Sequence, residues 1–460
     1  MFKKALFITI FLSLSISNPT YGYDFTSIDS SNIKSVQIVG ADNVCHHLIK
    51  QISGIDTSVV LTHDLIEKGK QHLLQSVLFS EVQVFYTKEQ NGADVFIKIE
   101  EGPRFSISDI GGMLYSYKYG ERDPWWRLQF GITDHNFRNK MERLSLTASI
   151  WEWRSLALLW VKPLIGTPYY IGLGSSFASY PYDIWAYDYR DIVARAQIGR
   201  NLNHQTRVAF NIIPTFRRRI GRASSSDTSV VEEGVKDFYE AFATLSLIKD
   251  HRSRRFDPES GFYNRTQLMT NYLYHGANTP FWQLSNDFRF YLTSFLESHK
   301  FAFRLNTTVR NRNAGNYHRR MYGGSGQVRG YTTKELGANF VVNNSILFSS
   351  EYRFPIWTAP DMPFPLVSIL YPGVRTLSWR IDGALIYDYA RIGSKLSDLI
   401  VAGSETETGH GVGAALRIMF PNIRNTICFD VVFGRRKRDP KTNPSFTWPP
   451  VLYLYLDMHF

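Results

Sequence analysis

Two segments contain residues of the kinds that enzymes and metal sites use. Ser325 lies in the glycine-rich run YGGSGQVRGY (322–331), but Gln327 stands where the serine of a G-x-S-x-G turn needs a glycine. Cys45-His46-His47 carries a thiol and two imidazoles, but no second pair of ligands follows at zinc spacing, so we expect it on a helix surface. The sequence therefore predicts no catalytic residues, no cofactor and no metal.

The glycine-rich run also contains Arg329, whose chemistry is ionic. Its planar guanidinium group pairs with carboxylates, and several follow it, among them Glu351 in SEYRFP (350–355) and Asp382 in WRIDG (379–383). Strand alternation puts both acids on the polar face of their segments. We therefore expect Arg329 to reach Glu351 or Asp382 and to tether the loop. The alternative is a solvated loop arginine, since exposed ion pairs contribute little to stability.

Residues 113–460 supply the strands that must position this loop. Segments of about ten residues alternate between apolar and polar side chains, as the strands of a membrane barrel do. The clearest pair is 282–295 and 301–310, joined by a tight turn. In the first of these, one face carries Trp282, Leu284, Phe288, Phe290 and Leu292, and the other carries Gln283, Ser285, Asp287, Arg289 and Thr293. The pattern predicts strands with one face in lipid and the other in water.

A large soluble β-sandwich is the alternative fold, because its strands alternate as well. Repeated Arg and Asp on the polar face argue against it, because a sandwich core could not bury them unpaired, whereas a wet lumen tolerates them. Counting back from Phe460 predicts about sixteen antiparallel strands, the first near Met113. The long polar connections then share the outer side, at 217–236, 311–344, 389–409 and 435–450, and the other side has short connections except 355–376.

The N-terminus predicts export. Lys3 and Lys4 precede an apolar run from Ala5 to Ile16, and small residues follow, so 1–22 is typical of a signal peptide. An anchor helix is the alternative, but the run is too short to span a bilayer. The two cysteines fall in different predicted domains and exclude a disulfide scaffold. For an exported protein, the net charge of +11 suits anionic lipid headgroups better than nucleic acid.

Residues 30–110 predict a small α+β domain in the order β-α-α-β-β. Thr62 can cap the second helix. The segments 81–86 and 94–100 alternate on either side of Asn91-Gly92, which is a strong turn dipeptide. An isolated hairpin is only marginally stable, so the helices must cover one face of the sheet.

Two parts of the chain resemble known families. The N-terminal domain resembles a POTRA domain in LFSEV (78–82), which leads into a strand, and in EEGP (100–103), which follows another. VRGY (328–331) resembles the VRGF/Y motif of the BamA/TamA-like outer-membrane assembly and secretion superfamily, the bacterial surface antigen barrels. DPESG (257–261) and the acids after the motif match that family's pattern. DHNF (134–137) resembles its early turn, although Arg138-Asn139-Lys140 replaces the usual glycines.

The resemblance implies a sixteen-stranded barrel with the sixth outer loop inside. Val328, Arg329, Gly330 and Tyr331 would hold that loop, with Glu351 and Asp382 as the lumen partners of Arg329. The last segment places Leu454, Leu456, Met458 and Phe460 on one face and ends in an aromatic residue, which resembles the barrel assembly signal. The expected fold is thus an all-β transmembrane barrel (113–460) after a small α+β POTRA-like domain (30–110).

The resemblance also implies a function. Such proteins insert or translocate polypeptides at the bacterial outer membrane, here by strand pairing at a barrel seam, with the N-terminal domain in the periplasm. The implied partners are unfolded polypeptide clients, periplasmic or inner-membrane accessory proteins, outer-membrane lipids and lipopolysaccharide. The basic run Arg435–Arg438 could bind lipopolysaccharide phosphates, or it could be a solvated loop. The alternative function is a passive channel or surface antigen with the same barrel and no client handling.

Overall fold

The structure is a computed structural model that describes residues 31–456 with gaps. The gaps are 43, 76–78, 90–91, 102–103, 118–126, 152–153, 165–166, 183–186, 204, 223–237, 254–256, 276–279, 312–321, 325, 332–334, 338–339, 360–361, 364–375, 402, 404, 421–424, 437–444 and 447–449. The expected signal peptide, Ser325 and the last two residues of the expected assembly signal, Met458 and Phe460, therefore lie outside the described residues.

The N-terminal domain has the expected elements and one short strand more. It consists of β1 (Ser31–Val39), α2 (His46–Ser53), β2 (Val60–Leu61), α3 (His63–Gln75), β3 (Phe79–Glu89) and β4 (Gly92–Glu101). The sheet order is β2-β1-β4-β3, with β1 parallel to β4 and β3 antiparallel to it. The two-residue strand β2, between the helices, was not expected from the sequence.

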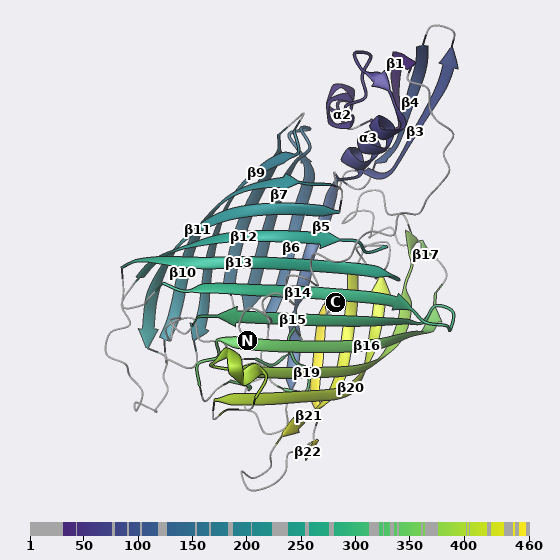
Figure 1. Cartoon of the computed structure of the whole chain (residues 1–460). Helices are drawn as coiled ribbons and strands as arrows, with labels where there is room; N and C mark the ends of the chain where they lie inside the picture. The colour runs from purple at the N-terminus through teal and green to yellow at the C-terminus, as the bar shows by residue number, and fades with distance from the viewer. Residues whose placement is uncertain are drawn as a thin grey trace.

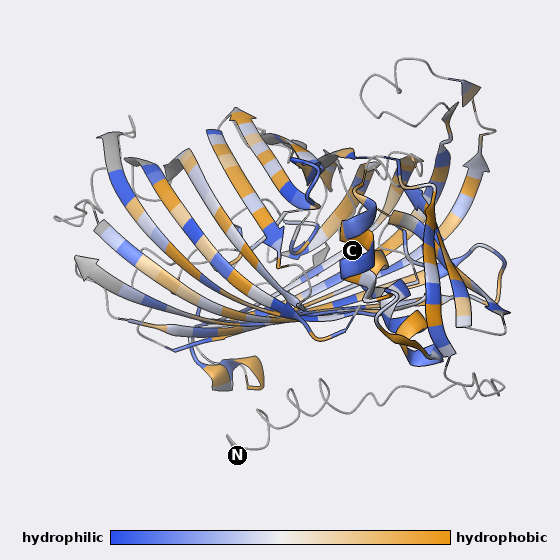
Figure 2. Cartoon of the chain, turned by 90° about the horizontal axis from the view of Figure 1, so that it is seen from above, coloured by the Kyte–Doolittle hydropathy of each residue, from blue (hydrophilic) through white to orange (hydrophobic). Residues whose placement is uncertain are grey.

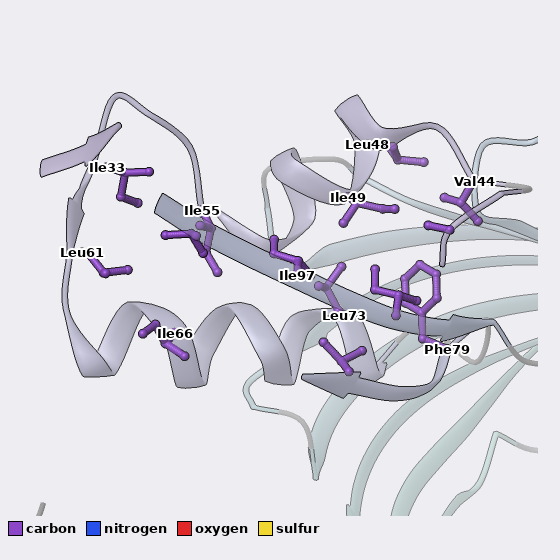
Figure 3. Packing of buried hydrophobic residues seen from close by; sticks show 14 of the residues in the cluster. Ile33, Val44, Leu48, Ile49, Ile55, Leu61, Ile66, Leu73, Phe79 and Ile97 are labelled. Carbon is purple, nitrogen blue, oxygen red and sulfur yellow. The ribbon is translucent and has the colours of Figure 1, made fainter. Parts of the chain in front are cut away.

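Both helices pack on one face of this sheet, as the hairpin argument requires. Val95 and Ile97 alternate inward along β4 and are fully buried. Leu73 of α3 and Ile49 of α2 close the core over them (Figure 3). The start of α3 is capped as expected, because the Leu65 backbone N–H donates to Thr62 Oγ1 at 3.1 Å.

The larger domain is a closed antiparallel barrel (Figure 1). Among the described residues its ring contains sixteen strands: β5 (Phe105–Tyr117), β6 (Arg127–Phe137), β7 (Glu142–Trp151), β8 (Arg154–Pro163), β9 (Tyr169–Tyr182), β10 (Tyr187–Asn201), β11 (Thr206–Arg222), β12 (Phe238–Asp250), β13 (Gly261–His275), β14 (Trp282–Thr293), β15 (Lys300–Arg310), β16 (Asn344–Thr358), β19 (Arg380–Gly393), β20 (Thr406–Phe420), β21 (Asn425–Arg436) and β23 (Val451–Leu456). The ring closes where β23 pairs with β5. The expected all-β barrel is confirmed.

Shorter elements accompany these strands. A two-residue strand β22 (Ser445–Phe446) pairs antiparallel with the end of β21, between β21 and β23 in the sheet order, and β17 (Met362–Pro363) pairs with β18 (Thr376–Leu377) in the connection between β16 and β19. A 3-10 turn, η2 (Leu396–Leu399), lies between β19 and β20. Within the described residues, no helix is both long and apolar enough to cross a membrane.

The two faces of the barrel differ as the alternation predicts. Figure 2 shows apolar and polar residues following one another along the strands. On β8, Leu156 and Leu158 point outward and are about half exposed, at 54% and 44%. Facing the lumen are buried charged residues such as Glu351 and Arg353. This arrangement excludes a sandwich with a dry core, because the charged face is the inner one.

The structure corrects the expected start of the barrel. The first strand begins at Phe105 rather than near Met113. Its N-terminal part pairs with β6, from Phe105↔Asp134 to Gly111↔Gln129. The last residues assigned to the POTRA-like domain (30–110) thus belong to the barrel. The alternation of Phe105–Ser108 is only four residues long and breaks at Ile110 and Gly111-Gly112, so it does not mark the beginning of a long strand clearly.

Candidate functional site

The loop between β15 and β16 folds as a small hairpin inside the barrel. Tyr322 and Leu336 exchange two backbone hydrogen bonds of 2.9 Å, and the Gly324 N–H donates to the Tyr331 carbonyl at 2.9 Å. Val328, Tyr331 and Leu336 are buried in one apolar cluster with residues of the barrel wall. The loop is therefore fixed to the wall by apolar packing as well as by its charges.

The side chain of Arg329 is completely buried, and its Nε, Nη1 and Nη2 atoms all donate hydrogen bonds to carboxylates. Its Nε and Nη2 donate to the two carboxylate oxygens of Asp388, each at 2.8 Å, and its backbone N–H donates to Asp388 Oδ2 at 2.8 Å. Its Nη1 donates to Glu351 Oε1 at 2.5 Å and to Asp430 Oδ2 at 3.2 Å. The fork of the guanidinium group thus joins β16, β19 and β21 through one loop residue.

Two further arginines complete this charge cluster. Arg417 Nη2 donates to the same oxygen of Glu351 at 2.5 Å, and Arg353 Nε donates to the other oxygen at 2.8 Å. The cluster balances three guanidinium groups (Arg329, Arg353 and Arg417) against three carboxylates (Glu351, Asp388 and Asp430). Removal of one member would leave an uncompensated buried charge, which is much more unfavourable than the loss of an exposed pair.

The structure brings Glu351 to Arg329, but it places Asp382 elsewhere. Asp382 accepts two hydrogen bonds from Arg380, at 2.7 and 2.8 Å. Sequence reasoning missed Asp388 and Asp430. Asp388 stands on the same face of β19 as Asp382 but six residues farther along, opposite Ser349, and is therefore the diagonal neighbour of Glu351 on the adjacent strand. Alternation predicts the face of the strand on which a residue lies but not its position along the barrel wall. Only the pairing register of β16 and β19 gives that position.

Asp382 belongs to a second ionic cluster, near the other end of these strands. Asp257, in the turn between β12 and β13, accepts a hydrogen bond from Arg380 Nη2 at 2.7 Å and another from Lys300 of β15. Arg353 Nη1 lies 4.0 Å from the same carboxylate. Because Arg353 also bonds to Glu351, the turn that carries Asp257 is linked through side chains to the cluster around Arg329.

The residues after Arg329 are held by the last strand. Tyr453 of β23 accepts a hydrogen bond from the Gly330 N–H at 3.0 Å and donates one to the Tyr331 carbonyl at 2.5 Å. The hydroxyl of Tyr331 in turn donates to the Arg435 carbonyl at 2.7 Å. The motif residues that follow Arg329 therefore contact the strand that closes the barrel.

Glycines permit this close approach. Gly330 has φ +92°, and a Cβ atom there would lie 2.9 Å from the backbone nitrogen of Gly434. On the wall, a Cβ atom at Gly411 would lie 2.0 Å from the carbonyl oxygen of Arg329. The loop backbone thus packs directly on the backbone of β20 and β21, at positions where no side chain fits.

The seam between the first and last strands is short. Five residues of β23, from Leu452 to Leu456, are paired with β5, with an irregularity between Leu454 and Tyr455. Eleven residues of β14 are paired with β15. Tyr453 and Tyr455 point into the barrel and are buried, whereas Leu452 is exposed, as the alternation predicts. The seam therefore has fewer backbone hydrogen bonds than a typical strand pair of this barrel.

The other candidates from the sequence gain no site from the structure. His46 and His47 begin helix α2, with Cys45 before them. Within the described ranges, no three His, Cys, Asp or Glu residues gather closely enough to hold a metal ion. Cys45 and Cys428 are both free thiols. Arg435 contributes its backbone carbonyl to the Tyr331 hydrogen bond, and the described structure does not cover Lys437 and Arg438.

Comparison with solved structures shows the same fold at low sequence identity. BamA from Haemophilus ducreyi lacking POTRA domains 1–3 matches with a TM-score of 0.58 and 13% identity over 93% of this chain and 84% of that one. CdiB from Acinetobacter baumannii matches with a TM-score of 0.61 and 15% identity over 93% and 74% of the two chains. CdiB from Escherichia coli matches with a TM-score of 0.58 and 13% identity over 93% and 76%.

The sequence itself identifies the family. No curated protein matches this chain in sequence. The family model of the Omp85 superfamily domain matches residues 126–443, which is more than half of the chain and includes the loop with Arg329. The barrel, the buried loop and this match agree, and the chain belongs to the Omp85 superfamily of outer-membrane β-barrel proteins.

Proposed function

We propose that this protein assists the insertion or translocation of polypeptides at the outer membrane, by strand pairing at the seam between β5 and β23. The observation that carries the proposal is the short seam. An open strand edge in lipid leaves backbone groups unpaired, and an incoming strand can satisfy them by adding to the sheet. Only five residues of β23 pair with β5, as few as pair between β5 and β6 and one fewer than pair between β23 and β21, so few backbone pairs must break for the edge of β23 to become available.

The N-terminal domain supports the same proposal. In its described sheet order, β3 is an outer strand, paired on one side with β4. Such an edge can accept an extended segment through main-chain hydrogen bonds. We propose that the domain lies in the periplasm and receives clients along β3, in the segment 81–86. The domain is joined directly to one strand of the seam, because β4 ends at Glu101 and β5 begins at Phe105.

A disulfide across the seam tests the mechanism. Tyr115 and Leu454 are paired residues of β5 and β23, so Tyr115→Cys with Leu454→Cys would lock the seam after Cys45 and Cys428 are replaced by serine. The matched control is Phe429→Cys with Leu454→Cys, which joins β23 to its other neighbour, β21. We expect the seam lock, and not the control, to change the outer-membrane proteome of cells that depend on this protein, with recovery under reducing conditions.

Two results would contradict the proposal. Normal assembly of client proteins with the seam fully oxidised would show that strand pairing there is unnecessary. A large, steady pore in planar bilayers combined with an unchanged outer-membrane proteome on depletion would favour a passive channel. A lumen that holds its own loop should instead conduct little.

A further inference from the structure

The described residues of the buried loop form hydrogen bonds with β15, β16, β19, β20, β21 and β23. A cavity of about 530 Å³ lies against β6 to β11, away from the strands that hold Arg329. Small side chains line it, among them Ser145, Ala157 and Ser176, together with Gly174. Because these residues barely protrude from the wall, they leave room beside it for an extended chain.

The charges around this cavity have one sign. Among its lining residues are Arg143, Arg195 and His135, and none of the lining residues is Asp or Glu. The opposite wall differs, since there Arg289 and Arg304 share Asp287, at 2.7 and 2.8 Å. The wall of this cavity is therefore cationic, whereas most other lumen arginines that the structure describes pair with a carboxylate.

Arg195 is the central cation of the cavity. Its Nε and Nη2 both donate to the neutral amide oxygen of Asn211, at 3.0 and 2.8 Å. In the described part of the chain, no ion pair joins Arg195 to a carboxylate. A guanidinium group held against a wall with only a neutral partner favours the approach of an anion, because a charge-assisted hydrogen bond is stronger than a neutral one.

The other residues that line the cavity indicate which class of anion fits beside Arg195. The hydroxyl groups of Ser145, Thr147 and Ser176 can donate further hydrogen bonds, and Leu159 and Ile213 supply apolar surface beside the charges. This mixture suits carboxylates spaced along an extended peptide better than a compact inorganic ion. We propose that the β6–β11 wall binds acidic stretches of a polypeptide, with Arg195 as the main contact. The proposal rests on the proposed function, because it assumes that polypeptides enter the lumen.

Binding of labelled peptides to the full-length protein in detergent tests the proposal. The probes are short peptides that alternate serine with glutamate, glutamine or lysine, followed by fluorescence anisotropy. We expect the glutamate peptide to bind best and its affinity to fall with added salt. In Arg195→Gln its affinity should fall about tenfold, the loss expected for one charge-assisted hydrogen bond. Arg190→Gln, on the opposite face of β10, should leave it unchanged.

A second variant keeps Arg195 and its contacts in place. Ser176→Asp puts a carboxylate in the cavity and should weaken binding of the glutamate peptide, whereas Ser176→Asn, of the same size, should not. Equal affinity for the three peptides, or unchanged affinity in both Arg195→Gln and Ser176→Asp, would overturn the proposal. Competition by free glutamate at equal carboxylate concentration would also overturn it, because the site would then be one for small anions.

This experiment is independent of the seam test. Peptide binding uses purified protein without client assembly. If the seam disulfide blocks client assembly but the protein binds the three peptides equally, only the lumen site is refuted. Acidic binding in a protein whose locked seam still supports assembly refutes only the seam mechanism.

Discussion

At the scale of single residues, Arg329 bonds to carboxylates that lie far from it in the sequence. A double-mutant cycle separates the true partner from the one first expected. Arg329→Ala should lower the free energy of unfolding by about 3–5 kcal/mol, since it leaves buried carboxylates without a counter-charge. Its effect should be strongly non-additive with Asp388→Asn and nearly additive with Asp382→Asn, as measured by urea unfolding in micelles. Equal coupling to both acids would contradict the described geometry.

Asp257 predicts a pH dependence. Burial alone would raise the pKa of this carboxyl, but the charges of Lys300, Arg380 and Arg353 outweigh it and hold the pKa below its ordinary value. The stabilisation is therefore complete above the unfolded-state pKa of about 3.9 and is lost as the pH falls through the lower folded-state pKa. Asp257→Asn should be less stable at neutral pH and should lose less stability on acidification. Unfolding curves at several pH values below 5 would show parallel losses if this ion pair were irrelevant.

The residues of the site were only partly predictable. Arg329 and Glu351 could be found because one stands in a glycine-rich motif and the other in a clearly alternating strand. Asp388 and Asp430 could not, because each is one acid among several on a polar face, and its height depends on the register between strands. The close packing of Gly330 on Gly434 could not be predicted either, since glycine in a loop has many explanations.

At the scale of elements, the turn between β6 and β7 contains backbone strain. Arg138, Asn139 and Met141 have φ values of 59°, 57° and 55°, in the left-handed region where glycine is favoured. The side chain of Asn136 supports the turn by accepting from the Met141 N–H at 2.9 Å. Met141 itself is buried in the core cluster of the N-terminal domain. The strained turn thus places the side chain of Met141, a residue of the barrel, in the core of the N-terminal domain.

A glycine scan of this turn tests the strain. Asn139→Gly should stabilise the protein by about 1 kcal/mol, because it relieves a left-handed backbone at a side chain that points into solvent. Lys140→Gly, at the neighbouring exposed position without positive φ, should instead destabilise it slightly through unfolded-state entropy. Differential melting of the two variants gives the comparison. Destabilisation of the same size in both would show that the backbone at 139 is relaxed.

Secondary structure was predictable wherever one face of an element is apolar. The strands from β14 to β16 and the hairpin of β3 and β4 follow from alternation alone. β5 did not, because its alternation breaks after Ser108 and its first half is defined by pairing with β6. β2 has only two residues and leaves no periodicity to detect.

At the scale of the whole molecule, the loop and the barrel closure share Tyr453. Tyr453→Phe removes the hydroxyl that bonds Gly330 and Tyr331, so a buried backbone donor and acceptor lose a partner. We expect slower disulfide formation between Tyr115→Cys and Leu454→Cys in this variant, because β23 is held less firmly against β5. Tyr387→Phe, which loses a hydroxyl on the outer face, is the control. Identical oxidation rates in Tyr453→Phe and Tyr387→Phe would show that the loop does not affect the closure of the barrel.

The overall architecture was the most predictable level, since the barrel follows from alternation that repeats along most of the chain with charged residues on the polar face. The placement of the N-terminal domain was not, because it depends on contacts such as Arg104 with Asp134, at 3.1 Å, between segments that no sequence pattern joins.

The hydroxyl of Tyr453 links the loop and the closure of the barrel in both directions. Thermodynamic linkage is reciprocal: if separation of the terminal strand loosens the loop, then a ligand that binds the loop must shift the equilibrium of the terminal strand by the same free energy. An antibody that recognised the seated hairpin would therefore stabilise the closed ring, and one that extracted the hairpin would promote its opening.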